Sequence, residues 1–511
     1  MRKRGILLAA PGSGSGKTTI TCALLAALKK RNIPVRSFKS GPDYIDPMFH
    51  SRVIGIPSRN LDTFFSEASQ IQELYDYGEE GMFSVIEGAM GIYDGLGGTQ
   101  KEGSAYHLAQ TLDLPVILVV DAHGMGRTLL ALLAGIQSYD TDKRLAGVIL
   151  NRITPGFYGI IAPIIEEELH LPVLGFFPKA TDLQMESRHL GLKMPDEIVQ
   201  LQTQVAHAAE LLEANVDVEK LLEMAGWKEE KAEDKYGAAG SVFDADEKST
   251  VRIAVAKDEA FCFYYEDNLR MLHEAGADLV AFSPLHDKQL PENVQGILLG
   301  GGYPELCAEA LSGNVSMRKS IRETIAQGMP SVAECGGFMY LHETLTDENG
   351  QTYPMVGAVR GGCHNTGKLV RFGYVNVTEQ ESHFLSQKVI RAHEFHYYDS
   401  DSNGESCEAV KPTTGRKWKC IHENENFRTC IIRPIRLLWN ILSGKQKNGR
   451  KEKTGVNHEK SNLDCKFRNN LSGNQTEEYY GNPRAGAGVV SGCADRGSGV
   501  EYNCSKSNAD A

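Results

Sequence analysis

A glycine-rich loop near the N-terminus constrains most strongly what this chain can fold into. The loop follows the apolar run Gly5–Ala10 and precedes an amphipathic stretch at residues 18–31. A strand, a glycine turn ending in Lys-Thr and a helix, in that order, direct backbone N–H groups and a helix N-terminus at phosphates. A flexible turn before an ordinary helix is the alternative, and the ordered arrangement favours nucleotide binding over it. The loop residues are Pro11, Gly12, Ser13, Gly14, Ser15, Gly16, Lys17, Thr18 and Thr19.

The loop also predicts roles for its side chains. Lys17 is expected to meet the β- and γ-phosphates of ATP, and the Thr18 hydroxyl to bind Mg²⁺. Pro11 stands where a strict motif has its first glycine, so the match is partial. The residues assigned to the nucleotide in and around the loop are Gly12, Gly14, Gly16, Lys17, Thr18, Thr19 and Lys39.

Apolar runs that alternate with helical patterns predict two α/β domains, the first with a parallel sheet. The first covers residues 1–225, with strands expected at Gly5–Ala10, Val35–Lys39, Ser84–Glu87, Val116–Asp121 and Gly147–Asn151. A polar linker is expected at 226–250. The second domain covers 251–427, with strands at Arg252–Ala256, Ala277–Phe282, Gly296–Leu299, Pro330–Glu334 and Tyr374–Val377.

Composition narrows the class of protein. The formal net charge of −12 disfavours a nucleic-acid partner, which needs a basic face, so a small-molecule partner is expected. No stretch approaches the length of a membrane span. The 11 cysteines show neither zinc-type nor disulfide spacing, and the short apolar run at 5–10 is interpreted as a strand and not as a signal peptide. Together these features predict a cytoplasmic enzyme.

Acidic residues stand beside glycines at two expected strand ends, the edge of an open α/β sheet where ligands bind. Glu87 ends an apolar run, as an acid that holds Mg²⁺ does, and Asp43 could complete the metal shell. Asp46 and Asp94 lie further along their loops and are assigned to a second substrate beside the γ-phosphate. Ordinary turn chemistry is the alternative for all four, and the phosphate loop makes function the better interpretation.

A cysteine in the second domain has the setting of a nucleophile. The strand at 330–334 leads into Cys335 and two glycines before a helical pattern, which is the layout of a nucleophile elbow. A second glycine turn at 300–305 could supply backbone N–H groups as an oxyanion hole. A buried structural cysteine is the alternative. A nucleophilic Cys335 needs a base, and His393, His396 and His422 are all open candidates.

These segments together resemble the cobyrinic acid a,c-diamide synthase family of the cobalamin pathway. The resemblance covers about residues 3 to 425. It is carried by the phosphate loop, Lys39–Asp46, Glu87–Asp94, Asn151-Arg152, Arg188–Leu192, Gly300–Glu305, Cys335-Gly336-Gly337 and Glu394–Tyr397.

The resemblance implies a dethiobiotin-synthetase-like domain joined to a class I glutamine amidotransferase domain. Cys335 would hydrolyse glutamine through a thioester, and ATP would activate the c and then the a carboxylate of cobyrinic acid as an acyl phosphate. In family terms Asp43 and Glu87 are metal or ATP residues, and Asp46 and Asp94 handle substrate and intermediate. Asn151 resembles an adenine contact. A homodimer is a further expectation.

The chain departs from the family pattern after Asn426-Phe427. Family members carry the catalytic histidine in a His-x-His segment at this point, where this chain reads Arg428-Thr429-Cys430. Residues 428–468 carry eleven Lys or Arg against three acids, and residues 428–511 lose periodicity. We interpret 428–511 as an aberrant, disordered tail and hypothesise a reading-frame change near position 428.

Other readings remain open at this point. A close relative acting on hydrogenobyrinic acid or nickel-sirohydrochlorin would share these motifs. A partitioning-type regulatory ATPase is a different class, but such proteins have no second domain with a cysteine elbow. A damaged copy that folds poorly is the third reading.

Overall fold

The computed structural model describes residues 4–78, 81–180, 183, 195–227, 251–380, 389–423, 427–430 and 433–434. The Arg188–Leu192 segment, residues 228–250 of the expected linker and most of 428–511 lie outside the described residues.

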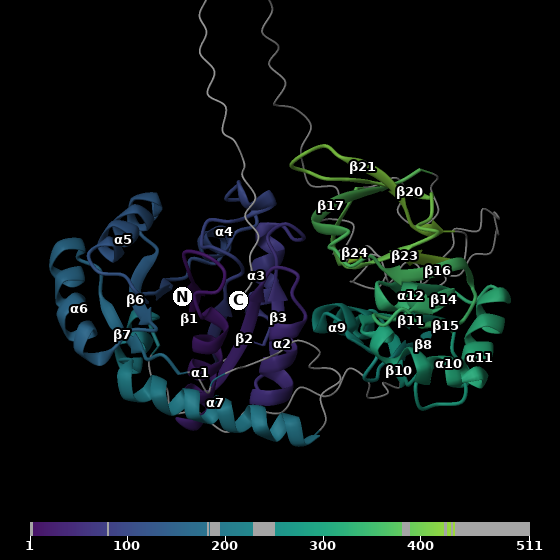
Figure 1. Cartoon of the computed structure of the whole chain (residues 1–511), viewed down its shortest axis with the longest axis horizontal. Coiled ribbons are helices and arrows are strands. Elements are labelled where there is room, and N and C mark those ends of the chain that lie inside the picture. The colour runs from purple at the N-terminus through teal and green to yellow at the C-terminus, as the bar shows by residue number, and fades with distance from the viewer. Residues whose placement is uncertain are drawn as a thin grey trace, which may run out of the picture. The chain divides into compact units, whose positions relative to one another are not determined.

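The N-terminal domain is built on one parallel sheet of seven strands in the order β3-β2-β4-β1-β5-β6-β7 (Figure 1). Every neighbouring pair in it is parallel, so the carboxyl ends of all seven strands share one edge. The strands are nearly continuous apolar runs because both faces are buried. Their bounds are β1 Gly5–Ala9, β2 Val35–Ser40, β3 Ser58–Leu61, β4 Phe83–Glu87, β5 Val116–Asp121, β6 Leu145–Asn151 and β7 Val173–Phe177.

Helices cover both faces of this sheet and create two apolar cores. The long helix α7 runs along α1 on one face (Figure 1), whereas α4, α5 and α6 supply the core on the other. The bounds are α1 Lys17–Lys30, α2 Ile45–Phe49, a π-helical turn at His50–Ile54, α3 Ala68–Asp76, a 3₁₀ turn at Leu96–Gly98, α4 Ala105–Leu112, α5 Thr128–Tyr139, α6 Pro155–Leu169, α7 Pro195–Asn215 and α8 Val218–Met224.

The second domain has its own sheet, in the order β10-β8-β11-β13-β23-β22. All neighbouring pairs in it are parallel except β22 and β23. Strand β23 spans the boundary expected between residues 427 and 428. The bounds are β8 Val251–Ala256, β10 Ala277–Phe282, β11 Gly296–Leu299, β13 Ser331–Glu334, β22 His422–Glu423 and β23 Phe427–Cys430, with helices α9 Glu266–Glu274, α10 Ala308–Gly313, α11 Val315–Ala326 and α12 Gly336–Leu341 and a 3₁₀ turn at Pro304–Cys307.

Three smaller sheets complete this domain, in the orders β12-β9, β15-β14-β16-β19 and β21-β20-β17-β18-β24. The last of them covers a small apolar cluster on one of its faces. The bounds are β9 Phe261–Phe263, β12 Gly301–Gly302, β14 His342–Thr346, β15 Thr352–Pro354, β16 Val359–Asn365, β17 Arg371–Glu379, β18 Ile390–His396, β19 Tyr398–Ser400, β20 Cys407–Val410, β21 Lys417–Cys420 and β24 Arg433–Pro434.

The ten strands expected from the sequence are all present, with ends shifted by one or two residues except in the longer β17. The edge strands β3 and β7 were not expected. Within the described ranges, no helix is both long and apolar enough to cross a bilayer.

Candidate functional site

The glycine loop joins β1 to α1 at the carboxyl edge of the first sheet. Gly14 and Gly16 have φ angles of 79° and 92°, which favour glycine. A Cβ on Gly16 would lie 2.1 Å from Nδ2 of Asn151, so only glycine fits beneath the Asn151 amide. Gly12 contributes its carbonyl, which accepts from Lys17 Nζ at 3.2 Å. The backbone freedom of Gly14 and Gly16 and the bond from Lys17 to Gly12 therefore keep the loop in one compact turn.

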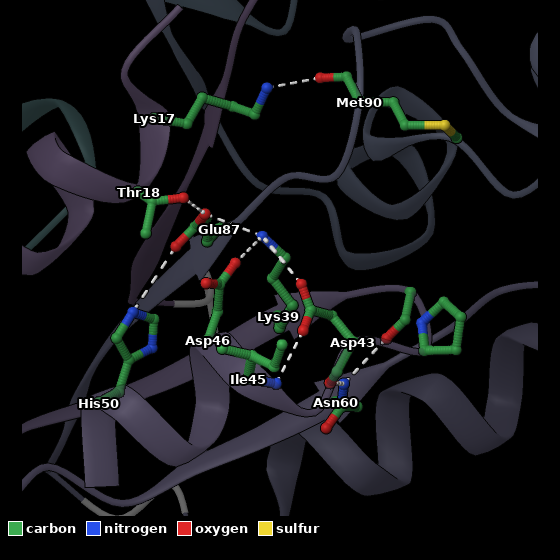
Figure 2. A network of polar contacts seen from close by, with 12 residues as sticks. Lys17, Thr18, Lys39, Asp43, Ile45, Asp46, His50, Asn60, Glu87 and Met90 are labelled. Atoms are coloured by element: carbon green, nitrogen blue, oxygen red, sulfur yellow. Dashed lines mark hydrogen bonds and ion pairs between the residues drawn. The ribbon is translucent and has the colours of Figure 1, made fainter. Parts of the chain in front are cut away.

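Lys17 is buried at the start of α1 and reaches across the loop. Its Nζ donates to the carbonyl of Met90 at 2.5 Å, in the loop that follows β4 (Figure 2). Burial, with the nearby Lys39 ammonium, lowers the pKa of Lys17. An ammonium held against two carbonyls is positioned to bind phosphate oxygens in their place. Thr19 lies one residue further along, in the first turn of α1.

The predicted acids converge on one lysine. Lys39 Nζ donates to Asp46 Oδ2 at 2.5 Å and to Glu87 Oε1 at 2.8 Å, and it lies 4.0 Å from Asp43 Oδ2. Thr18 Oγ1 donates to the same Glu87 oxygen at 2.6 Å. Figure 2 shows these side chains directed at one another from α1, β2, β4, the loop before α2 and α2 itself. The sequence assigned Lys39 to the nucleotide, whereas its contacts in this structure are to carboxylates.

Burial and neighbouring charges shift the pKa values of Asp43, Asp46 and Glu87 in different directions. Burial raises the pKa of Glu87 to about 7, and burial with the adjacent Asp46 charge raises the pKa of Asp43 to about 6. Burial alone would also raise the pKa of Asp46. The Lys39 ammonium outweighs burial, so the pKa of Asp46 is lowered. Burial opposes the charge on Lys39 itself, yet the charges of Glu87 and Asp46 raise its pKa. Asp46 is thus the most firmly ionised member of the cluster.

His50, which the sequence interpretation missed, adjoins this cluster from the π-helical turn after α2. Its Nδ1 lies 2.8 Å from Ser37 Oγ, and its Nε2 lies 3.6 Å from Glu87 Oε2. Neither Nε2 nor Oε2 has a hydrogen-bond partner among the described residues, and both are buried. Burial lowers the pKa of His50 to about 4, so the ring is neutral at pH 7. No motif marks this histidine, so only the fold could reveal it.

The oxygens at this edge fit Mg²⁺ chemically. Mg²⁺ takes hard oxygen ligands and is bound in nucleotide sites by one or two carboxylates, a hydroxyl and the phosphates themselves. Thr18 and Glu87 supply such a hydroxyl and carboxylate, and the buried Glu87 Oε2 lacks a partner among the described residues. In the part of the chain that is described, no three or more His, Cys, Asp or Glu side chains are arranged so that they alone could hold a metal ion.

Asp94 and Asn151 frame the loop from two other strand ends. Asp94 Oδ2 accepts from the backbone N–H of Gly91 at 3.0 Å, in the loop that also carries Met90. The Asn151 amide donates to the Ser15 carbonyl at 2.8 Å, so it fastens the glycine loop to the end of β6. A contact between Asn151 and adenine stays a prediction.

Cys335 stands at the elbow that the sequence predicted, between β13 and α12. Its φ of 50° and ψ of −110° are strained for a residue with a side chain, as at the nucleophile turns of other enzymes. A Cβ on Gly337 would lie 2.3 Å from the Leu299 carbonyl, and one on Gly336 would lie 3.1 Å from the Gly302 nitrogen. The two glycine turns expected from the sequence therefore meet at this cysteine.

The three histidines that are candidate bases for Cys335 all contact other residues. His393 packs edge-on against the Tyr374 ring, His396 Nδ1 donates to the Tyr398 carbonyl at 2.7 Å, and His422 Nε2 contacts Ser402. Among the described residues, none of the three histidines hydrogen-bonds to Cys335. The missing His-x-His segment after Phe427 therefore still bears on which residue acts as the base for Cys335.

Two loops at the carboxyl edge of the first sheet contact the second domain: residues 41–44 between β2 and α2, which include Asp43, and residues 62–67 between β3 and α3, which include Asp62. We call these two segments the acid loops. Tyr374 Oη donates to Asp62 Oδ2 at 2.9 Å, and Arg391 donates to the Phe64 carbonyl at 2.7 Å. Tyr265 Oη donates to the carbonyl of Pro42, the residue before Asp43, at 2.9 Å. The loop that carries Asp43 belongs to the first domain and thus also contacts the second.

Comparison with known proteins agrees with this geometry. Residues 6–192 match the family described as the CobQ/CobB/MinD/ParA nucleotide binding domain, and residues 252–430 match the CobB/CobQ-like glutamine amidotransferase domain. The cobyrinate a,c-diamide synthase of Clostridium acetobutylicum is 39% identical over 83% of this chain and 95% of its own length. Enzymes of the same name from Synechocystis and Salmonella typhimurium are each 39% identical, over 76% and 78% of this chain and 81% and 86% of their own.

This similarity extends over both domains and over nearly the whole length of the relatives. The domain order, the nucleotide loop and the cysteine elbow all agree with it. The chain therefore belongs to the cobyrinate a,c-diamide synthase family.

Proposed function

We propose that this protein amidates the a and c carboxylates of cobyrinic acid, with ATP as the activating substrate and glutamine or ammonia as the nitrogen source. The observation that carries the proposal is the cluster of Lys39, Asp46 and Glu87 beside the glycine loop, in a chain that also presents Cys335 on an elbow. The relatives are named for cobyrinate, which favours it over hydrogenobyrinic acid and nickel-sirohydrochlorin. The amidotransferase domain disfavours a partitioning ATPase.

A carboxylate cannot be amidated directly because its oxygen is a poor leaving group. In the proposed reaction a carboxylate oxygen of the substrate bonds to the γ-phosphorus of ATP and the bond to ADP breaks. Ammonia then attacks the acyl carbon, the carbon–oxygen bond to phosphate breaks, and a proton from the nitrogen leaves with the phosphate. Each amide therefore consumes one ATP and yields one ADP and one phosphate.

The proposed roles follow from the contacts. Lys17 would exchange the Met90 and Gly12 carbonyls for phosphate oxygens, and its charge would offset that of the γ-phosphate as it transfers. Thr18 and Glu87 would hold Mg²⁺, which when bound reduces the repulsion between carboxylate and triphosphate. Lys39 keeps Asp46 ionised and fixed, so that Asp46 can orient an incoming group.

Asp94 and Asp43 are assigned to the second substrate and the metal. Asp94 lies in the same loop as the Lys17 acceptor Met90, so a group bound there would lie close to the transferred phosphate. Asp43 is partly buried, enough to raise its pKa, but 39% of its side chain is accessible, the largest fraction among the acids near Lys39, and this exposed part suits contact with a ligand.

The nitrogen source is assigned to the second domain. Cys335 would attack the glutamine side-chain amide, which forms a thioester and releases ammonia. Water would then cleave the thioester, which releases glutamate and restores the thiol. The meeting of the 300–305 turn with the elbow supports an oxyanion hole there. A homodimer and a cytoplasmic location are further parts of the proposal.

Incubation with cobyrinic acid, ATP and Mg²⁺, followed by mass spectrometry, tests the proposal. Ammonium salts should support one and then two amidations, and omission of ATP should abolish both. No change in mass with either glutamine or ammonia would reject the assignment.

A further inference from the structure

An exposed row of aromatic side chains lies on one face of the β17–β18 pair. Phe372 and Phe395 face each other across the two strands, with ring centroids 5.6 Å apart. Tyr397 extends the row, 6.0 Å from Phe395. These three side chains are 52%, 56% and 48% exposed, which is unusual for large rings gathered at one place. We call Phe372, Phe395 and Tyr397 the aromatic platform.

The platform lies on the face of the sheet that is turned away from its apolar cluster. Residues directly opposite in an antiparallel pair share a face, so Phe372, Tyr374, His393 and Phe395 lie together on one side. The alternate residues, such as Val375 and Ala392, point to the other side and form the buried apolar cluster there. The sheet thus has its core behind it and carries its rings on the opposite face.

The row of rings leads to the acid loops. Tyr374 lies two residues along β17 from Phe372, and its hydroxyl donates to Asp62. The same hydroxyl oxygen would lie 3.6 Å from a Cβ placed on Gly41. Gly41 is two residues from Asp43. A strand rises about 3.3 Å per residue, so Phe372 is about 7 Å beyond Tyr374 along the strand. One large ligand could therefore touch the platform and reach the acids.

A second contact places the same sheet against the Asp94 loop. A Cβ on Gly97 would lie 2.9 Å from the Thr413 side chain, which belongs to the turn between β20 and β21. One cation borders the platform, and another lies further along the same face of the sheet. Arg391 extends from the same face of β18, and the Lys411 ammonium donates to the Phe372 carbonyl. The platform rings meet edge to face, with interplanar angles of 73° and 89°, so they form an exposed apolar surface and not a coplanar stack. An apolar surface with a cation beside it suits an apolar ring system that carries acidic side chains.

We infer that the aromatic platform binds the macrocycle face of the tetrapyrrole substrate, while one of its carboxylates extends to the acid loops. This inference rests on the proposed function and adds a substrate-binding surface to it. Contacts between exposed aromatic side chains and the face of a ring system are apolar, so they do not fix which carboxylate is presented. Such a surface would let the macrocycle turn between the two amidations without leaving the second domain.

Alanine variants of the platform test the inference. Phe372 and Phe395 are exposed, so Phe372→Ala and Phe395→Ala remove the ring surface without opening a core. Equilibrium dialysis of the full chain against cobyrinic acid should show binding about tenfold weaker in the double variant, with unchanged ATP affinity. The variants Phe372→Tyr and Phe395→Trp should restore binding, because they keep an aromatic face. Tyr139→Ala, at a 62% exposed ring on α5, is the matched control and should bind as the parent does.

The outcomes separate this inference from the proposed function. If the parent protein amidates cobyrinic acid and the double variant binds it unchanged, the platform assignment is wrong while the function stands. If the double variant instead changes the sedimentation of the protein and not its affinity, the platform is a contact between copies of the chain, and the inference is again overturned. A parent that neither binds nor amidates cobyrinic acid contradicts the function and the inference together.

Discussion

His50 shows how one side chain can position a reacting group without meeting the substrate. Its neutral ring accepts from Ser37 through Nδ1 in the tautomer that leaves an N–H on Nε2, which faces the unpartnered Glu87 Oε2. That Nε2 atom lies 3.6 Å from the second oxygen of a carboxylate whose first oxygen is bound by Thr18, so a small shift would bring the two into a hydrogen bond. We therefore expect His50 to orient Glu87 for Mg²⁺.

Replacement of His50 should weaken nucleotide binding in a metal-dependent way. His50→Leu removes the N–H and should reduce the affinity for ATP with Mg²⁺ about tenfold, the usual range for a group behind a metal ligand. Binding of ATP measured with EDTA should change much less. His50→Gln keeps a donor and should recover part of the loss, and His123→Gln, at an exposed histidine, serves as the control. Equal losses with and without Mg²⁺ would mean that His50 has only a structural part.

Lys39 is the counterion of three acids, and its removal should destabilise the fold. Lys39→Met leaves Asp46 and Glu87 buried without a cation, at a cost of about 3 to 5 kcal/mol. Urea unfolding of the variant should show this loss. Lys30→Met removes a charge that is 62% exposed and should change the stability little. Unaltered unfolding of Lys39→Met would show that the carboxylates are not ionised together.

At the scale of elements, sequence patterns predicted the strands well because a buried parallel strand is a short, uniform apolar run. They missed β3, whose segment Ser58–Leu61 is polar and lies at the edge of the sheet. They also missed the contacts that give the loops their shape. The Asn151 bond to Ser15 joins residues 136 positions apart, and the Lys17 bond to Met90 joins residues 73 apart. Such pairs have no local signature.

The contact between the β3–α3 loop and β17 should depend on pH. Burial raises the pKa of Asp62 to about 6, although the Tyr374 hydroxyl and two backbone N–H groups favour its charged form. A pKa raised on folding stabilises the protein most below the unfolded value of 3.8, and this contribution is lost as pH rises through about 6. The difference of about two pKa units corresponds to about 3 kcal/mol.

Asp62→Asn tests this directly, because an amide has no proton to lose. Its stability relative to the parent should improve by up to about 3 kcal/mol between pH 4 and pH 7, as measured by urea unfolding. Asp76→Asn, at the end of α3 and outside the contact between Asp62 and Tyr374, is the control variant for the same measurement. A constant difference between Asp62→Asn and the parent over that range would show that Asp62 is ionised throughout.

At the scale of the whole molecule, the two proposed sites differ in how completely their side chains are connected. The nucleotide side has an interlocked set of contacts, whereas Cys335 has an elbow but no assigned base. The sequence identified the reason, because the pattern after Phe427 lacks the expected histidine segment. The hypothesis of a reading-frame change stays a prediction, and translating the other frames of the gene beyond codon 428 tests it.

The nitrogen source gives the matching kinetic prediction. A missing base lowers thiol catalysis by about a hundredfold or more, so glutamine should support amidation much less well than ammonia. Cys335→Ala should abolish the remaining glutamine-dependent rate and leave the ammonia-dependent rate unchanged. Equal rates of the parent with glutamine and with ammonium salts would contradict the prediction and would point to a base elsewhere in the chain.

The most direct test of the central claim follows an oxygen atom. Cobyrinic acid labelled with ¹⁸O in its carboxylates is incubated with ATP, Mg²⁺ and ammonia, and the released phosphate is analysed by mass spectrometry. Activation as an acyl phosphate predicts one ¹⁸O in the phosphate for each amide formed, because the carboxylate oxygen leaves on phosphorus. Amide formation with unlabelled phosphate would contradict the account.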